Sequence, residues 1–149
     1  MTSLEKFREI FSVNLYAPLA IIEALKPDLI RERKCSIINI CSDSAIIADA
    51  GYTAYSSSKA SLIEATKILA SELGKYNIRV NAIAPGLTET DMGLGNKTDS
   101  DLCYIQENVA MRRFAKPEEI AETVLYLAGD KSEYINGETI VCNGGRTLM

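Results

Sequence analysis

The N-terminal part of the chain carries apolar side chains at steps of three and four residues, which is the periodicity of an amphipathic helix. We therefore predict one long helix over residues 3–30. Thr2 and Glu5 have the spacing of a capping box at its start. Pro18 is expected to bend this helix, and Pro27 to bend it again or to begin a new turn.

Three short apolar runs further along the chain predict buried strands. The first of them is rich in β-branched residues, which suits a strand covered on both faces in a parallel sheet. The expected elements are, in chain order, a strand at 36–41, a small-residue loop at 42–51, a helix at 53–74, a strand at 78–84, a loop at 87–100, helices at 101–111 and 117–129, and a strand at 138–142. This alternation predicts a single α/β domain over residues 1–149, with helices flanking a parallel sheet.

Composition excludes several classes of function. The net charge of −4 and the pI near 4.9 offer no basic surface for nucleic acid. No apolar run approaches the ~20 residues of a membrane-spanning helix, and the charged N-terminus does not resemble a secretory leader. We therefore expect a soluble, cytoplasmic protein with no nucleic-acid or membrane partner.

The chain contains four cysteines and no histidine. None of the cysteines forms a CxxC pair, so no metal site is expected, and we interpret all four as reduced, small, buried apolar residues. The cysteines are Cys35, Cys41, Cys103 and Cys142. The lack of histidine also excludes His-based triads, so a general base must be a tyrosine, a lysine or a carboxylate.

A tyrosine and a lysine in the second predicted helix could form an acid/base pair. Tyr55 and Lys59 are four residues apart and therefore share a helix face. A nearby ammonium favours the phenolate and lowers the pKa of the phenol, which makes tyrosine a usable proton donor and acceptor. Alone, this spacing arises often by chance and favours two residues that merely share a helix face.

The pair does not stand alone, because other motifs occur at fixed distances around it. The motifs are VNLYAP (13–18), IINICS (37–42), YSSSK (55–59), IRVNAIAPGLTETDM (78–92) and INGETIVCNGG (135–145). In this order they cover nearly the whole chain and resemble the short-chain dehydrogenase/reductase family, in the subgroup that includes 3-oxoacyl-acyl-carrier-protein reductases. The resemblance implies the C-terminal three strands of a doubly wound, Rossmann-type parallel sheet.

The resemblance also implies roles for four residues. Tyr55 would be the catalytic acid/base, and Lys59 would lower the pKa of Tyr55 and bind the nicotinamide ribose. Ser42 would polarise the substrate carbonyl by placing a donor where negative charge develops. Asn14 would interrupt regular helix bonding and hold a water in a proton relay from Lys59. An Asn14 that is simply satisfied by neighbouring backbone is the alternative.

Further residues would contact the cofactor, which the resemblance identifies as NADP or NAD, with NADP favoured. Pro85 and Gly86 would let the backbone pass close to the nicotinamide. The backbone of Thr88 would bind the carboxamide, and the hydroxyl of Thr90 would reach the cofactor amide or phosphate. The alternative for this segment is an ordinary turn that ends a strand.

The glycine-rich turn with which such enzymes hold the pyrophosphate is absent, since the sequence contains neither GxGxxG nor GxxxGxG. We therefore expect weak dinucleotide binding and a truncated chain. The strand at 36–41 would have lost its sheet neighbour, which leaves an open edge. In the family the helices at 3–30 and 53–74 would form a subunit interface, so a homodimer or homotetramer is expected.

Two hypotheses for function remain open at this level. The first is an NAD(P)-dependent oxidoreductase that reduces a 3-oxoacyl thioester or a similar small ketone to an alcohol, weak or inactive in the truncated chain. The second is a non-catalytic dimerisation or interaction module derived from that family. A hydrolase built on Ser42 is disfavoured, because there is no histidine and no G-x-S-x-G elbow.

Overall fold

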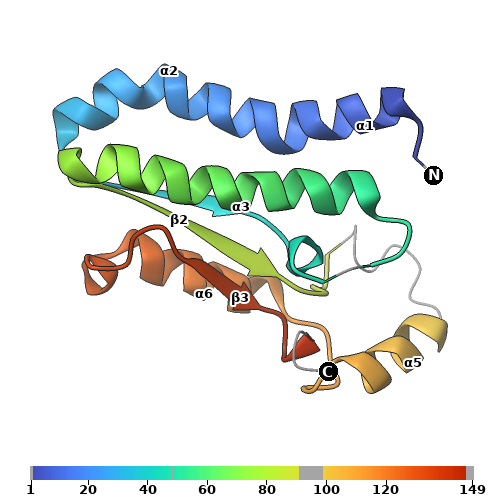
Figure 1. The fold of residues 1–149 in the computed structure, drawn as a ribbon. Helices are drawn as coiled ribbons and strands as arrows, with labels where there is room; N and C mark the ends of the chain where they lie inside the picture. Colours follow the sequence, from blue (N-terminus) through green and yellow to red (C-terminus); the bar gives the residue numbers. More distant parts are fainter. Residues whose placement is uncertain (1, 48, 91–98, 147–149) are drawn as a thin grey trace.

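A three-stranded parallel sheet with the order β1-β2-β3 lies at the centre of the structure (Figure 1). The computed structural model describes residues 2–47, 49–90 and 99–146. The strands are β1 (Cys35–Ile40), β2 (Ile78–Pro85) and β3 (Thr139–Cys142). Both connections between neighbouring strands pass through helices, as parallel pairing requires. The predicted α/β fold with a three-stranded parallel sheet is confirmed.

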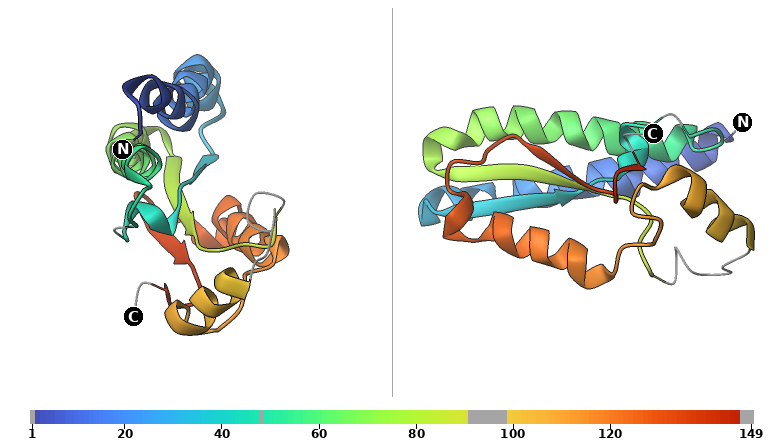
Figure 2. Two further views of the ribbon diagram at one scale, coloured as in Figure 1. Left: turned by 90° about the vertical axis from the view of Figure 1, so that its right-hand side faces the viewer. Right: turned by 90° about the horizontal axis from the view of Figure 1, so that it is seen from below.

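Helices cover both faces of this sheet (Figure 2). One face packs against α3 (Thr53–Leu73) and against the N-terminal helix, while α6 (Pro117–Ala128) covers the other. A further helix, α5 (Asp99–Asn108), lies beyond the carboxyl ends of the strands. Short 3-10 turns occur at Asp43–Ala45, Gly74–Tyr76 and Asp130–Ser132. Among the described residues, no helix is both long and apolar enough to cross a bilayer.

The predicted N-terminal helix forms as a continuous rod of three parts (Figure 1). The parts are α1 (Leu4–Phe11), a π-helical turn (Ser12–Tyr16) and α2 (Ala17–Glu32). The predicted capping box is wrong, because the N-cap is Ser3, whose hydroxyl accepts a hydrogen bond from the Lys6 N–H at 3.2 Å. One residue of offset is a common error at helix ends, where several small polar residues compete for the cap.

The π-helical turn has a physical cause in Pro18. A proline has no N–H to donate to the carbonyl four residues earlier, here that of Asn14, and its ring crowds that carbonyl. The turn widens instead, and the Ala17 N–H pairs with the Ser12 carbonyl five residues earlier. Regular helix bonding is therefore broken around Asn14, and the cause is Pro18 and not Asn14 itself. The role of Asn14 in holding a water stays a prediction. Pro27 lies inside α2, which continues past it.

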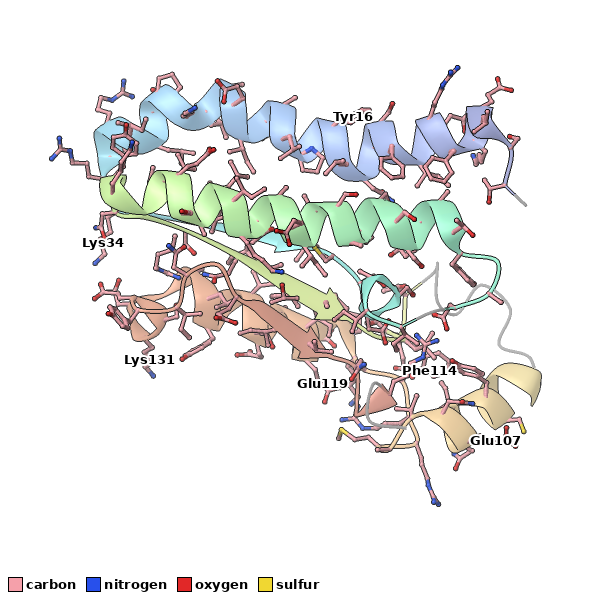
Figure 3. All side chains as sticks on the ribbon, in the orientation of Figure 1. Tyr16, Lys34, Glu107, Phe114, Glu119 and Lys131 are labelled. Carbon is pink, nitrogen blue, oxygen red and sulfur yellow. The ribbon has the colours of Figure 1, made fainter. Side chains whose placement is uncertain are left out.

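The main core lies between the sheet and its two-helix layer. Ile78 and Val80 of β2 pack with Leu73 of α3 and Ile22 of α2, and all four side chains are buried. Because β2 is central, its residues are buried on both faces. A separate small cluster joins Ile105 and Val109 to Phe114, which lies beside α5 (Figure 3).

The first strand differs from its prediction. We expected it to be covered on both faces, but most of β1 is half-buried and Ile40 is exposed. β1 lies at the edge of the sheet, and among the described elements no strand pairs with its outer side. The predicted open edge is therefore present in the described part of the chain.

A buried asparagine sets the position of the third strand. Asn81 of β2 is fully buried, and its amide donates to the Ile135 carbonyl at 2.9 Å. Its side-chain oxygen accepts from the Glu138 N–H at 3.0 Å. This pairing accounts for an asparagine inside an otherwise apolar strand, since a buried amide needs partners of this kind.

Candidate active site

The residues predicted to carry chemistry gather at the carboxyl edge of the sheet. Ser42 comes two residues after β1, Gly86 directly follows β2, and Asn143 directly follows β3. The crossover helix α3 begins at the same edge and brings Tyr55 and Lys59 in its first two turns. In open parallel sheets ligands bind at this edge, outside the carboxyl ends of the strands.

Ser42 is buried and oriented by its own backbone turn. It caps the 3-10 turn after β1, and its hydroxyl oxygen accepts a hydrogen bond from the Ser44 N–H at 3.2 Å. A serine hydroxyl has one donor and two acceptor positions. With one acceptor position used by Ser44, the O–H is available to donate to a substrate oxygen.

Lys59 is anchored at the end of the strand that leads to Ser42. Its ammonium donates to the Ile40 carbonyl at 2.8 Å. Burial lowers the pKa of Lys59 below its ordinary value, and this shift is opposed by the nearby Cys41. Burial also raises the pKa of the Cys41 thiol, to about 11, so this cysteine stays a neutral thiol. The hydrogen bond to Ile40 thus fixes the position of the lysine beside the strand end.

Tyr55 lies one helical turn before Lys59 on α3 and is half-buried. Its ring meets the ring of Tyr52 edge-on, with centroids 6.5 Å apart. Its backbone carbonyl accepts from the buried Ser58 hydroxyl at 2.7 Å. The Asn14 amide in turn donates to the Ser58 oxygen at 3.1 Å. The π-helical turn is therefore tied to the turn of α3 that carries Tyr55 and Lys59.

The segment after β2 is held by its own backbone. The Thr88 hydroxyl donates to the Gly86 carbonyl at 3.0 Å, and the Thr90 N–H donates to the Thr88 carbonyl at 2.9 Å. A parallel bridge between Thr88 and Ala115 joins this segment to the chain that leads into α6. Pro85 is the last residue of β2. The cofactor roles of these four residues stay predictions.

The structure explains Gly86 by a close approach within the protein. A Cβ at residue 86 would lie 2.6 Å from Cβ and 2.8 Å from Cα of Asn143. No side chain fits at residue 86, because the backbone of Asn143, directly after β3, passes close to Gly86. Packing between the ends of two strands is therefore sufficient to require glycine, and sequence reasoning missed this cause.

Replacing Gly86 with alanine should lower the free energy of unfolding by about 1–3 kcal/mol, the cost of an overpacked core position. Gly129 is a matched control, because a Cβ at that position would meet nothing closer than the Leu125 carbonyl oxygen at 3.5 Å. Urea unfolding followed by circular dichroism measures both variants. Equal stability of Gly86→Ala and Gly129→Ala would contradict the packing argument.

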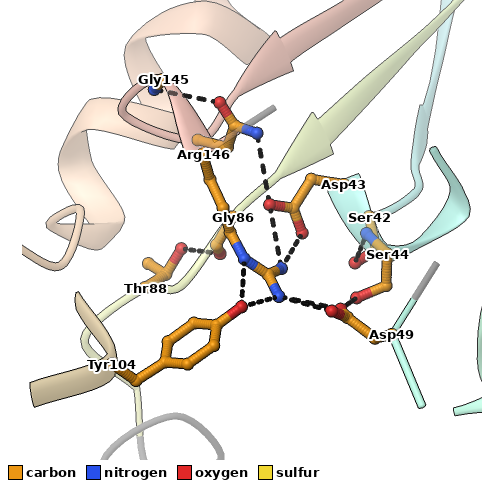
Figure 4. Close-up of polar contacts among 10 residues, drawn as sticks. Ser42, Asp43, Ser44, Asp49, Gly86, Thr88, Tyr104, Gly145 and Arg146 are labelled. Atoms are coloured by element: carbon orange, nitrogen blue, oxygen red, sulfur yellow. Dashed lines mark hydrogen bonds and ion pairs between the residues drawn. The ribbon is translucent and has the colours of Figure 1, made fainter. Parts of the chain in front are cut away.

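A buried polar cluster around Arg146 is the main feature that sequence reasoning missed (Figure 4). Arg146 contacts the carboxylates of Asp43 and Asp49 and the hydroxyl of Tyr104. Asn143 donates its amide to Asp43 at 3.3 Å. Asp43 is the residue next to Ser42, so the cluster adjoins the serine that is predicted to polarise the substrate carbonyl.

The residues present fit one end of a nicotinamide dinucleotide. The Lys59 ammonium has three N–H donors, and the described residues use one of them, on Ile40. Ribose hydroxyls are suitable acceptors for the others. No strand-to-helix turn in the sequence has the glycine spacing that receives a pyrophosphate. Among the described residues no group of three or more His, Cys, Asp or Glu side chains is placed to hold a metal ion.

Comparison with known proteins gives consistent matches over the whole chain. A family model described as enoyl-(acyl carrier protein) reductase matches residues 1–147. The chain is 38% identical over 146 residues to the 3-oxoacyl-[acyl-carrier-protein] reductase of Thermotoga maritima, which covers 97% of this chain and 58% of the relative. It is 35% identical over 145 residues to the 7alpha-hydroxysteroid dehydrogenase of Bacteroides fragilis, which covers 97% of this chain and 56% of the relative.

A solved structure of 4-hydroxyisoleucine dehydrogenase complexed with NADH has the same fold, with a TM-score of 0.88 and 32% identity. The match covers 99% of this chain and 62% of that protein. The chain thus spans less than two thirds of the length of each of these three relatives. From the family match, the fold and the order of the motifs, the chain belongs to the short-chain dehydrogenase/reductase family and corresponds to its C-terminal part.

Proposed function

We propose that this chain is the catalytic part of an NAD(P)-dependent oxidoreductase that reduces a carbonyl to an alcohol. One observation carries the proposal: the Lys59 ammonium is fixed 2.8 Å from the Ile40 carbonyl, two residues before Ser42. α3 holds Tyr55 one turn before that ammonium. A phenol, an ammonium and a hydroxyl are therefore supplied to one edge of the sheet by only two segments.

The chemistry divides between the cofactor and the chain. Bound nicotinamide dinucleotide supplies a hydride to the carbonyl carbon. The Tyr55 phenol donates its proton to the carbonyl oxygen as that oxygen gains negative charge, and the Ser42 O–H donates a hydrogen bond to the same oxygen. The Lys59 ammonium stabilises the phenolate that Tyr55 becomes. Hydride and proton together convert the carbonyl to an alcohol.

The chain would hold the cofactor by its nicotinamide end. Tyr55 and Lys59 would bind the ribose, and the segment from Pro85 to Thr90 would bind the nicotinamide. A relative of the same fold has been solved as a complex with NADH. The pyrophosphate and adenosine need residues that this sequence does not contain. Binding to the 149-residue chain alone is therefore expected to be weak. The sequence resemblance favours NADP, so both cofactors belong in a test.

The names of the relatives indicate a substrate class. The three relatives are named for an acyl-carrier-protein thioester, a steroid and a hydroxy amino acid. All three carry a secondary alcohol or the matching ketone beside a larger group. We propose a 3-oxoacyl thioester or a similar small ketone as substrate.

A second candidate function is an interaction module, and exposed apolar surface favours it. The N-terminal helix and α3 lie side by side and leave large apolar side chains in solvent, Tyr16 among them (Figure 3). These are Leu4, Val13, Tyr16, Ile21, Leu25 and Ile68. Exposed apolar surface of this kind marks association sites. A homodimer or homotetramer through these helices is compatible with either function.

The test of function uses two proteins. The first is the 149-residue chain, studied by sedimentation and by titration with NADPH and NADH. The second is a chimaera in which the N-terminal part of the Thermotoga maritima relative precedes Met1, assayed with acetoacetyl thioesters and simple ketones. We expect weak binding by the first and turnover by the second. A chimaera that binds NADPH and reduces none of these compounds would contradict the oxidoreductase and favour the interaction module.

A further inference from the structure

We infer that Arg146 is a positioning residue, which fastens α5 to the loop that carries Ser42. The expected effect of Arg146 on catalysis rests on the proposed function. The contacts that Arg146 makes do not depend on it. Arg146 follows β3, Asp43 and Asp49 belong to the loop after β1, and Tyr104 belongs to α5 (Figure 4). One guanidinium therefore joins three segments that are distant in the sequence.

Every nitrogen of the guanidinium is used. Nη1 donates to both carboxylate oxygens of Asp43 at 3.3 Å, and Nη2 donates to those of Asp49 at 2.8 and 2.9 Å. Nε and Nη2 donate to the Tyr104 hydroxyl at 3.1 and 2.6 Å. Arginine is suited to this task because its planar fork meets several acceptors at once. No nitrogen is left for a substrate, so the group orients the site and does not take part in the reaction.

The Arg146–Asp43 pair at the centre of the cluster is buried. The Arg146 side chain is 7% exposed and that of Asp43 is 3% exposed. Salt screens buried ion pairs less than ion pairs on the surface. Removing one partner of a buried pair leaves an uncompensated buried charge. The two carboxylates together exceed the single positive charge, so the cluster holds the arginine firmly.

Two hydrogen bonds through Ser44 connect the cluster to Ser42. The Ser44 hydroxyl donates to Asp49 at 3.3 Å, and the Ser44 N–H donates to the Ser42 oxygen at 3.2 Å. Asp43 is held from a second side by the amide of Asn143. The turn that orients the Ser42 hydroxyl is therefore fixed through Asp43 and Asp49, the two carboxylates that Arg146 binds.

The other end of the cluster holds α5. Tyr104 accepts two hydrogen bonds from Arg146, whose guanidinium carbon lies 5.4 Å from the centre of the tyrosine ring. Ile105, next in sequence, is buried in the small cluster with Phe114. α5 stands beyond the carboxyl ends of the strands, where a substrate would enter. The Tyr104–Arg146 contact therefore ties α5 to the Ser42 loop at the carboxyl end of the sheet.

Hydrogen exchange of the 149-residue chain, followed by mass spectrometry, tests this inference with no cofactor or turnover. In Tyr104→Phe, we expect the amides of 99–108 to exchange about tenfold faster, because α5 loses its hydrogen bonds to a charged group. The amides of 42–47 should change little. In Arg146→Lys, which keeps the charge but loses the fork, both segments should exchange faster. Arg31→Lys, at an exposed Arg–Asp pair on α2, is the matched control.

Unchanged exchange of residues 42–47 in Arg146→Lys would overturn the inference, as would equal acceleration across the whole chain. The effect of Arg146 on catalysis is measured separately, in the chimaera. Arg146→Lys should lower kcat for the ketone and leave KM for NADPH unchanged, because only the Ser42 side of the site moves. Unaltered kcat would refute the positioning role. If the unmodified chimaera reduces no ketone while the exchange result holds, the proposed function fails and the structural link stands.

Discussion

Replacing Tyr55 with phenylalanine should lower the rate of carbonyl reduction by the chimaera roughly 10³-fold, within the 10²–10⁴-fold range of general acid–base catalysis. The change removes one oxygen, and with it the proton that neutralises the developing alkoxide. The phenyl ring can keep its edge-on contact with Tyr52, so the fold should persist. Initial rates with an acetoacetyl thioester, at saturating NADPH, measure the effect on kcat.

The control for this experiment is Tyr134→Phe, which removes a hydroxyl from a fully exposed tyrosine on the opposite edge of the sheet. It should leave the rate unchanged. A Tyr55→Phe chimaera as active as the Tyr134→Phe chimaera would show that another group protonates the substrate. The role of Lys59 as the stabiliser of a phenolate would then be lost as well.

Replacing Arg146 with methionine should lower the free energy of unfolding at pH 7 by about 3–5 kcal/mol, the cost of breaking a buried ion pair. The expected loss is large because two carboxylates remain, and Asp43 is almost completely removed from solvent. Methionine preserves much of the packing volume, so the loss reports on charge more than on a cavity. Urea unfolding measures the difference from the unmodified chain.

This loss should depend on pH. Burial raises the pKa of Asp43 above its ordinary value, and Arg146 and Asn143 oppose that shift. Without Arg146 the pKa rises further. For a carboxyl whose folded pKa lies above its unfolded value of about 3.9, stability is intact below the unfolded value and is lost as pH rises through the folded value. The destabilisation should therefore be small near pH 4 and full at pH 7.

A double variant separates charge from packing in this cluster. Arg146→Met combined with Asp43→Asn removes the uncompensated carboxylate, and it should recover part of the stability that Arg146→Met loses at pH 7. Asp43→Asn alone should be destabilising, because Arg146 then keeps a single carboxylate partner. A loss in Arg146→Met that is the same at pH 4 and pH 7 would contradict the electrostatic account.

Local patterns in the sequence were sufficient for most of the fold. The steps of three and four along residues 3–30 and the apolar run of β2 predicted a helix and a buried strand that the structure contains. Helix and strand periodicity is written into neighbouring residues, so it can be recognised without the tertiary structure. The spacing of Tyr55 and Lys59 on one helix face is local in the same way, and the motifs around it identify the family.

Other features depended on contacts between distant parts of the chain. Arg146 meets Asp43 across 103 positions of sequence, and Gly86 meets Asn143 between the ends of two strands. Neither contact has a periodic or local signal, because each arises when parallel strands bring their carboxyl ends together. The sequence by itself determined the elements and the chemical groups of the site. Only the tertiary structure decided which charges are buried together behind Ser42, because burial is a property of packing and not of spacing.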